Sequence, residues 1–233
     1  LGIWDLILKR AAYVNIISSN SKTNWIIDNL SIDGGWEEGN GLYVIWESSN
    51  NTINKINVYK NKGQGASFIG SSNNNSINNS SFYNHNSDYG LYLGTQRNIL
   101  HNIQIYNNND GLAIANAYNT INNTQTYNNA NYGIHSTAWD NVFNNVQTYS
   151  NTVDGIVFDV ANNILNNFMA YNNAWIGINT KWYGTRFYGD TRSFGNAWWN
   201  FWTNLLEGDS SSVWWTDGNL IWWTLTRDFV TNS

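Results

Sequence analysis

The chain repeats the motif Ile105-Tyr106-Asn107-Asn108 three more times, as Thr126-Tyr127-Asn128-Asn129, Thr148-Tyr149-Ser150-Asn151 and Ala170-Tyr171-Asn172-Asn173. The four tyrosines stand 21, 22 and 22 residues apart. A fixed period of this length is typical of a solenoid, in which each repeat forms one coil and packs only on its neighbours. The stretch from Asn98 to Asn179 therefore predicts a solenoid.

Other positions of the repeat are equally regular. An Asn stands eight residues before each tyrosine, and the same phase extends upstream to Tyr59 and Tyr83; these residues are Asn51, Asn75, Asn98, Asn119, Asn141 and Asn163. Asn tolerates left-handed backbone angles, and its amide can bond to the same Asn one coil above and below. We therefore expect structural ladders of Asn at the corners. A Gly follows each of the four tyrosines quoted above by five or six residues, as in Gly133 and Gly155, and we expect it to supply a positive φ.

Short alternating apolar runs between the Asn corners predict two or three strands per coil, parallel to those of the next coil. We divide the chain into N-terminal cap or entry strands (1–26), a parallel solenoid of about seven or eight coils (27–200), and a Trp-rich C-terminal cap or flap (201–233).

The pattern Asn-x-Ile-x-Asn-Asn-x-x-x-Tyr-Asn-Asn, followed by Gly-Ile, resembles the right-handed parallel β-helix repeat of the pectate-lyase-like superfamily. The resemblance covers about residues 27–200 and implies an all-β, right-handed parallel β-helix. That superfamily includes lyases, hydrolases, epimerases, phage tailspikes and catalytically silent surface proteins, so the fold does not select an activity. The His-Gly and Arg-x-Lys motifs of its polygalacturonase-type members are absent here.

Composition limits the partners. The net charge is −5 and only 12% of the residues are charged, so the surface repels phosphate backbones and we expect no nucleic acid. No apolar run approaches the roughly 20 residues that span a bilayer, so we expect no membrane span. The chain has no Cys, which removes soft metal ligands. We expect no cofactor, with Ca²⁺ as the alternative if carboxylates converge.

Three aspartates are the catalytic candidates. Asp88, Asp110 and Asp154 stand one or two residues before the Gly of their coils and should share one edge of the solenoid. Carboxylates about 5 Å apart suit a retaining glycosidase and wider pairs an inverting one. The alternative is that an Asp before a Gly is a turn residue that bonds to its own backbone.

The three histidines fall at different phases and cannot converge on a metal. His85 stands two residues after its tyrosine, His101 five before and His135 eight after. We expect each to be exposed or to replace an Asn in a ladder.

Aromatic residues make up 16% of the chain. We expect the repeat tyrosines to stack and four phenylalanines to lie in the core: Phe68, Phe82, Phe143 and Phe168. The C-terminal tryptophans are candidates for binding carbohydrate or a partner, since flat exposed aromatics bind sugar rings and proteins alike. These residues are Trp198, Trp199, Trp214, Trp215, Trp222 and Trp223.

The leading hypothesis is a non-catalytic extracellular or cell-surface domain, acting as a rigid structural or adhesive module that binds carbohydrate. Other surface proteins or a second copy of the chain are alternative partners. The rival is a polysaccharide lyase or glycoside hydrolase that uses Asp88, Asp110 and Asp154. Ice binding ranks lower, because the threonines do not form one column over many coils.

Overall fold

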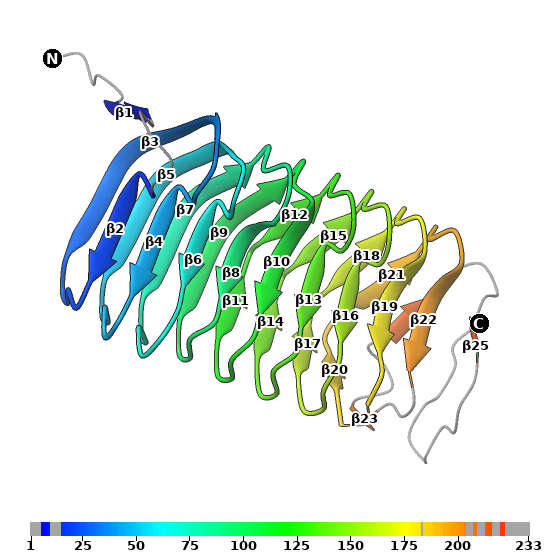
Figure 1. Ribbon diagram of the computed structural model, residues 1–233. Coiled ribbons are helices and arrows are strands. Elements are labelled where there is room, and N and C mark those ends of the chain that lie inside the picture. The colour runs from blue at the N-terminus through cyan, green and yellow to red at the C-terminus, as the bar shows by residue number, and fades with distance from the viewer. Residues whose placement is uncertain are drawn as a thin grey trace, which may run out of the picture.

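The computed structural model describes residues 6–9, 15–182 and 184–203, together with the backbone of three short strands after residue 203. All regular structure in this part of the chain consists of β-strands. The described residues contain no helix that could cross a membrane. The strands form two parallel sheets that wind as a solenoid of about eight turns (Figure 1). The expected all-β parallel β-helix is confirmed.

Sheet A contains 15 strands. In the early coils each strand is long and bends at a left-handed residue such as Lys55, Asn79 or Asn102. From Thr120 onward the same bend separates two short strands. The strands of sheet A are β1 (Leu6–Lys9), β3 (Ile26–Glu37), β5 (Thr52–Asn61), β7 (Ser76–Tyr83), β9 (Ile99–Tyr106), β11 (Thr120–Asn122), β12 (Gln125–Tyr127), β14 (Val142–Asn144), β15 (Gln147–Tyr149), β17 (Ile164–Asn166), β18 (Met169–Tyr171), β20 (Arg186–Tyr188), β21 (Thr191–Phe194), β23 (Glu207–Gly208) and β24 (Val213–Trp215).

Sheet B contains ten strands and runs along the opposite side of the solenoid. Its strands are β2 (Ile17–Asn20), β4 (Leu42–Ile45), β6 (Ala66–Phe68), β8 (Tyr89–Leu93), β10 (Asp110–Ile114), β13 (Ile134–Ser136), β16 (Ile156–Phe158), β19 (Ile176–Thr180), β22 (Trp199–Thr203) and β25 (Leu220–Ile221). Sheet pairing crosses both domain boundaries that the sequence suggested, since β2 pairs with β4 and β22 with β25.

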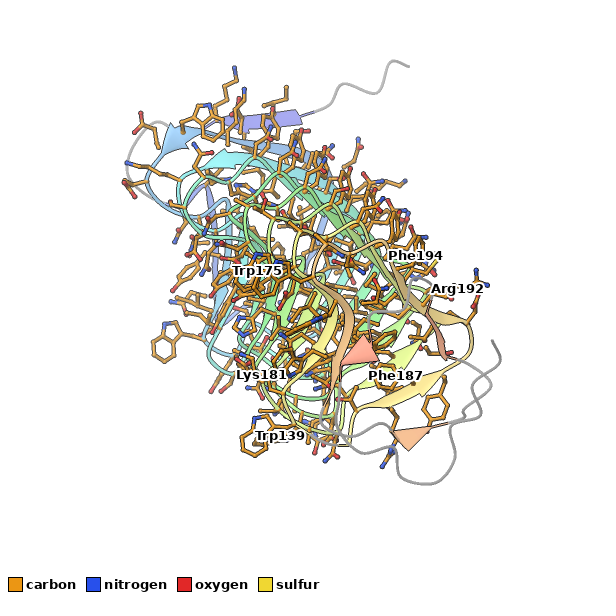
Figure 2. The ribbon with its side chains drawn as sticks, turned by 90° about the vertical axis from the view of Figure 1, so that its right-hand side faces the viewer. Trp139, Trp175, Lys181, Phe187, Arg192 and Phe194 are labelled. Carbon is orange, nitrogen blue, oxygen red and sulfur yellow. The ribbon has the colours of Figure 1, made fainter. Side chains whose placement is uncertain are left out.

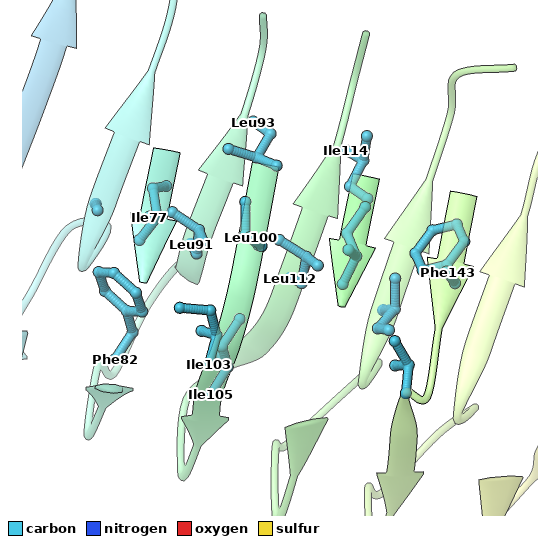
Figure 3. Close-up of a cluster of buried hydrophobic side chains, with 14 of the residues drawn as sticks. Ile77, Phe82, Leu91, Leu93, Leu100, Ile103, Ile105, Leu112, Ile114 and Phe143 are labelled. Atoms are coloured by element: carbon cyan, nitrogen blue, oxygen red, sulfur yellow. The ribbon is translucent and has the colours of Figure 1, made fainter. Parts of the chain in front are cut away.

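The core lies between the sheets and is built from columns of equivalent side chains. Alternate residues point inward in each strand, so that Leu112 aligns with Leu91 and Ile134. Figure 3 shows Leu91 and Leu112, together with Phe82 and Phe143, projecting into the interior from both sheets. The four phenylalanines expected in the core are all buried.

Two buried Asn ladders fix the corners. In the predicted ladder, the side-chain Oδ1 of Asn141 accepts the backbone N–H of Asn119 at 2.8 Å, and Asn163 does the same for Asn141 at 3.1 Å. The left-handed residue is the one just before each of these, such as Asp140. The sequence assigned both the left-handed backbone and the ladder hydrogen bond to one Asn. In the structure the residue before that Asn has the left-handed backbone, and the Asn itself makes the ladder hydrogen bond.

The second ladder follows each tyrosine by two residues. It includes Asn108, Asn129 and Asn151, linked again from backbone N–H to side-chain Oδ1. His85 occupies this ladder, where its Nδ1 accepts the backbone N–H of Asn61 at 3.2 Å. The prediction that a histidine replaces an Asn in a ladder is confirmed at this position.

The repeated glycines correct one prediction. Gly111, Gly133, Gly155 and Gly177 are not among the residues with positive φ. A Cβ at Gly155 would lie 2.5 Å from the Gly177 carbonyl oxygen and 2.8 Å from Asn173 Nδ2. Gly is needed here because the next coil and the Asn ladder leave no room for a side chain.

Candidate functional site

Sheet A is regular on its outer face. The rings of Tyr59, Tyr83, Tyr106, Tyr127, Tyr149, Tyr171 and Phe194 stack with centroids 4.8–5.2 Å apart, which confirms the predicted tyrosine column. Every interior ring has a neighbour on both faces and shows only its edge to solvent. A sugar ring binds to the face of an aromatic ring, so this column is structural.

The outer face of sheet B is irregular by comparison. In consecutive coils its aligned outward positions hold Tyr92, Ala113, His135, Val157, Asn179 and Trp202. A function that depends on specific side chains belongs at positions where a repeat protein departs from its repeat. We refer to this surface, with the turn residues on either side of it, as the sheet B face.

Three successive coils contribute a charged cluster to the sheet B face. His135 Nε2 lies 2.8 Å from Asp159 Oδ2, and Lys181 Nζ lies 2.6 Å from Asp159 Oδ1. Burial opposes ionisation of Asp159, but hydrogen bonds from Lys181 and His135 outweigh it and lower the pKa of Asp159. The hydrogen bond with Asp159 raises the pKa of Lys181. The Asp159 carboxylate is therefore held between two basic groups.

Tyr132 packs against this cluster. Its ring centroid lies 5.2 Å from that of His135, with the planes tilted by 47°. Burial raises the pKa of Tyr132, and the charge of Asp154 raises it further. The phenol is therefore a hydrogen-bonding group rather than an anion at neutral pH.

A buried polar pair lies beside the cluster. Asp154 is 3% exposed; its Oδ1 accepts the backbone N–H of Ile176 at 2.9 Å, and its Oδ2 accepts Asn179 Nδ2 at 2.8 Å. Burial raises the pKa of Asp154, against the opposing effect of these hydrogen bonds. Asn179 is 8% exposed, and within the described part of the chain no group donates to its Oδ1.

Tryptophans surround the C-terminal part of the sheet B face. Trp175 and Trp198 stack with their ring centroids 4.7 Å apart and planes within 4°, while Trp199 packs edge-on against Trp198 and tilted against Trp202. Figure 2 shows Trp175, Lys181 and Trp139 on one side of the coil, away from Arg192 and Phe194 on the other. The sheet B face thus combines open aromatic surface with polar groups.

The three candidate aspartates do not form one row. Asp110 and Asp154 occupy the same position two coils apart, with Tyr132 between them, because Gly111 N donates to Tyr132 O and Gly133 N to Asp154 O. Asp88 lies one residue out of phase, and its Oδ1 accepts the N–H of Tyr89. Their catalytic and Ca²⁺-binding roles stay predictions. In the described ranges no three His, Asp or Glu side chains are grouped closely enough to hold a metal ion.

The candidate tryptophans are described only in part. Trp198 and Trp199 lie on the sheet B face, as above. Trp214 and Trp215 belong to β24, whose side chains are outside the description, and Trp222 and Trp223 lie outside the described residues altogether.

Sequence reasoning missed His135 as a site residue, together with Asp159, Lys181 and Trp175. A usable signal was present, because Asp159 and Lys181 both stand ten residues after a repeat tyrosine and His135 stands eight after one. Positions two apart in a strand point to the same side.

Two shallow hollows of about 310 Å³ lie elsewhere. One is on sheet A and is lined by Asn145, Gln147, Asn167, Met169 and Asp190; the other is near the N-terminal end and is lined by Ile17, Ser18, Ser19, Lys22, Thr23 and Trp25. Each has a single charged side chain in its lining. The hollow on sheet A has no aromatic side chain in its lining, and the N-terminal hollow has one, Trp25, whereas the sheet B face carries several.

These features define a right-handed parallel β-helix with an irregular, aromatic-rich face on one sheet. Residues 14–174 match the right-handed beta helix region family, and the chain belongs to that family. A comparison of the sequence with curated proteins gave no match.

Solved structures with the same fold share little sequence with this chain. The periplasmic alginate epimerase AlgG has a TM-score of 0.66 at 17% identity, over 83% of this chain and 49% of that one. Pectate lyase Pel9A has a TM-score of 0.60 at 14% identity, over 91% and 58%. The A-module of the Azotobacter vinelandii mannuronan C-5 epimerase AlgE4 has 0.57 at 13%, over 88% and 70%. The chain spans about half the length of AlgG, and these likenesses show the fold alone.

Proposed function

We propose that the chain is a rigid, non-catalytic polysaccharide-binding module of an extracellular or cell-surface protein, and that its ligand lies along the sheet B face. The observation that carries this proposal is the stacked pair Trp175–Trp198 on the face that also carries the polar side chains of His135, Asn179 and Lys181. Indole surface binds the apolar face of a sugar ring, and polar side chains next to it bind the hydroxyl groups.

The Asn ladders and the tyrosine column support the structural half of this proposal. They hold successive coils at one spacing, so that side chains from different coils keep a fixed separation along the sheet B face. A surface of this kind suits an extended polymer, because little is lost in ordering the protein when the ligand binds. AlgG, AlgE4 and Pel9A, which have the same fold, are named for alginate, mannuronan and pectate. A polysaccharide ligand for this chain is consistent with those names.

Affinity gel electrophoresis tests the proposal. The purified chain should be retarded by at least one soluble polysaccharide, with no release of reducing ends or unsaturated products. The double variant Trp175→Ala/Trp198→Ala should lose at least ten-fold in affinity, whereas Trp36→Ala, which removes an exposed indole from strand β3 of sheet A, should bind as wild type. A chain that no polysaccharide retards would contradict the proposal.

The same assay addresses the C-terminal tryptophans. The double variant Trp214→Ala/Trp222→Ala should weaken binding only if the polysaccharide also contacts residues 201–233, as the sequence predicts. Unchanged binding would remove these two side chains from the binding surface.

The second candidate is a polysaccharide-active enzyme, a lyase or glycoside hydrolase. The arrangement that favours it is the cluster of His135, Asp159 and Lys181 with Tyr132, since histidine and tyrosine are common proton-transfer groups. Asp110 and Asp154 are less suited to this role because both carboxylates accept backbone N–H groups. Turnover that His135→Ala or Asp110→Asn abolishes would establish the enzyme and overturn the non-catalytic proposal.

A further inference from the structure

Trp175 has one open ring face. Trp198 covers the other at 4.7 Å, and in the preceding coil the aligned position is Val153, whose carbonyl accepts the N–H of Trp175 at 3.1 Å. Valine is too small to cover an indole, and Trp175 is 45% exposed. The indole therefore extends beyond Val153 and leaves a ledge, a gap of about one coil spacing next to its open face. A stacked ring occupies about this thickness.

Asn179 supplies a fixed acceptor on the same face. Its Nδ2 is engaged by the Asp154 carboxylate, which sets the amide orientation and leaves Oδ1 as the group without a donor. Asn179 Oδ1 is buried in the free protein, so a hydroxyl group reaches it only when the side chains that cover it move aside. Because a buried acceptor without a partner is unfavourable, a ligand that then donates a hydrogen bond to it gains affinity. A sugar hydroxyl group can donate this bond.

The charge around this position disfavours acidic ligands. Asp110, Asp154 and Asp159 contribute carboxyl groups to the sheet B face, and the nearby cation, Lys181, is paired with Asp159 at 2.6 Å. The chain as a whole has a net charge of −5. A polyanion would meet no excess of positive charge along this face.

We propose that Trp175, Asn179 and the surface above Val153 form a monosaccharide subsite that takes a neutral, hydroxyl-rich sugar unit. The sugar ring stacks on the open face of Trp175, and one of its hydroxyl groups donates to Asn179 Oδ1. This inference rests on the proposed function. It adds where on the sheet B face the sugar binds and which class of sugar binds there. It predicts a preference for neutral over acidic polysaccharides.

The test uses the full chain, with xylan, galactomannan and a soluble β-glucan as neutral probes and alginate and polygalacturonate as acidic ones. Wild type should bind at least one neutral probe ten-fold more tightly than either acidic probe. Trp175→Ala and Asn179→Ala should each weaken that binding about ten-fold, with Trp36→Ala in sheet A as the unchanged control.

Val153→Trp provides a variant that should fold well. Its indole would extend the Trp175–Trp198 stack by one coil and fill the ledge, so stability should be kept while neutral binding is lost. Wild-type binding that persists in both Trp175→Ala and Val153→Trp would overturn the subsite and leave the proposed function standing. Tighter binding of alginate or polygalacturonate would overturn the neutral preference, and a wild type that binds no probe would contradict both proposals.

Discussion

Removing one amide from a buried Asn ladder should destabilise the protein by a predictable amount. Asn141 is fully buried; its Oδ1 accepts the N–H of Asn119 at 2.8 Å, and its Nδ2 donates to the carbonyls of Ala138 at 3.0 Å and Trp139 at 3.3 Å. Asn141→Ala leaves one buried N–H and at least one carbonyl unpaired, each costing about 1–3 kcal/mol. We expect a loss of about 2–4 kcal/mol in the free energy of unfolding, a large part of the roughly 5–15 kcal/mol typical of proteins.

Asn144→Ala is the matched control. It lies three residues away in the same coil, but its side chain is on the outer surface, where Nδ2 donates to Asn122 Oδ1 at 2.9 Å and Oδ1 accepts Asn166 Nδ2 at 3.4 Å. Asn144→Ala should lower the free energy of unfolding by no more than about 0.5 kcal/mol. Urea unfolding of both variants, followed by circular dichroism, measures the difference. Equal destabilisation would show that the buried ladder does not stabilise the coils more than the surface Asn residues do.

Three further predictions concern the backbone and the charged cluster. Asn145, with a φ of 53°, should tolerate Gly but lose about 1 kcal/mol of unfolding free energy as Ala, because a left-handed Ala is strained. Gly155→Ala should destabilise by about 1–3 kcal/mol or reduce the soluble yield, since its Cβ would meet the Gly177 carbonyl. The pKa of Asp159 is lowered from 3.8 on folding, so its pairing with Lys181 stabilises the protein above that pH and is lost as the pH falls through the folded value. Wild type should therefore lose its stability advantage over Asp159→Asn on acidification below about pH 4 in thermal melts, and an advantage unchanged down to pH 2 would contradict this.

The fold could be predicted because its cause is a linear, repeated signal. Each coil adds the same corner residues at the same phase, so Asn119, Asn141 and Asn163 identify the ladder without knowledge of long-range contacts. The glycines show the limit of that reasoning. A Gly at a fixed phase satisfies either a positive φ or a close approach, and only the position of the next coil distinguishes the two at Gly155.

The candidate site was harder to predict because its residues depart from the repeat. His135, Asp159 and Lys181 come from three successive coils and two different phases, so none of them is notable in its own coil. The sequence drew attention to the adjacent pair Trp198-Trp199, but the stacked partner of Trp198 is Trp175, 23 residues earlier. The register between coils brings these two side chains together. The pair can be found in the sequence only by counting the repeat spacing along the chain.

A crystal structure of the chain with a bound neutral oligosaccharide would locate the ligand on one sheet or the other. We expect a pyranose ring parallel to the Trp175 indole, above Val153, with a hydroxyl within hydrogen-bond distance of Asn179 Oδ1. An oligosaccharide bound along the tyrosine column of sheet A, with the sheet B face empty, would contradict this expectation.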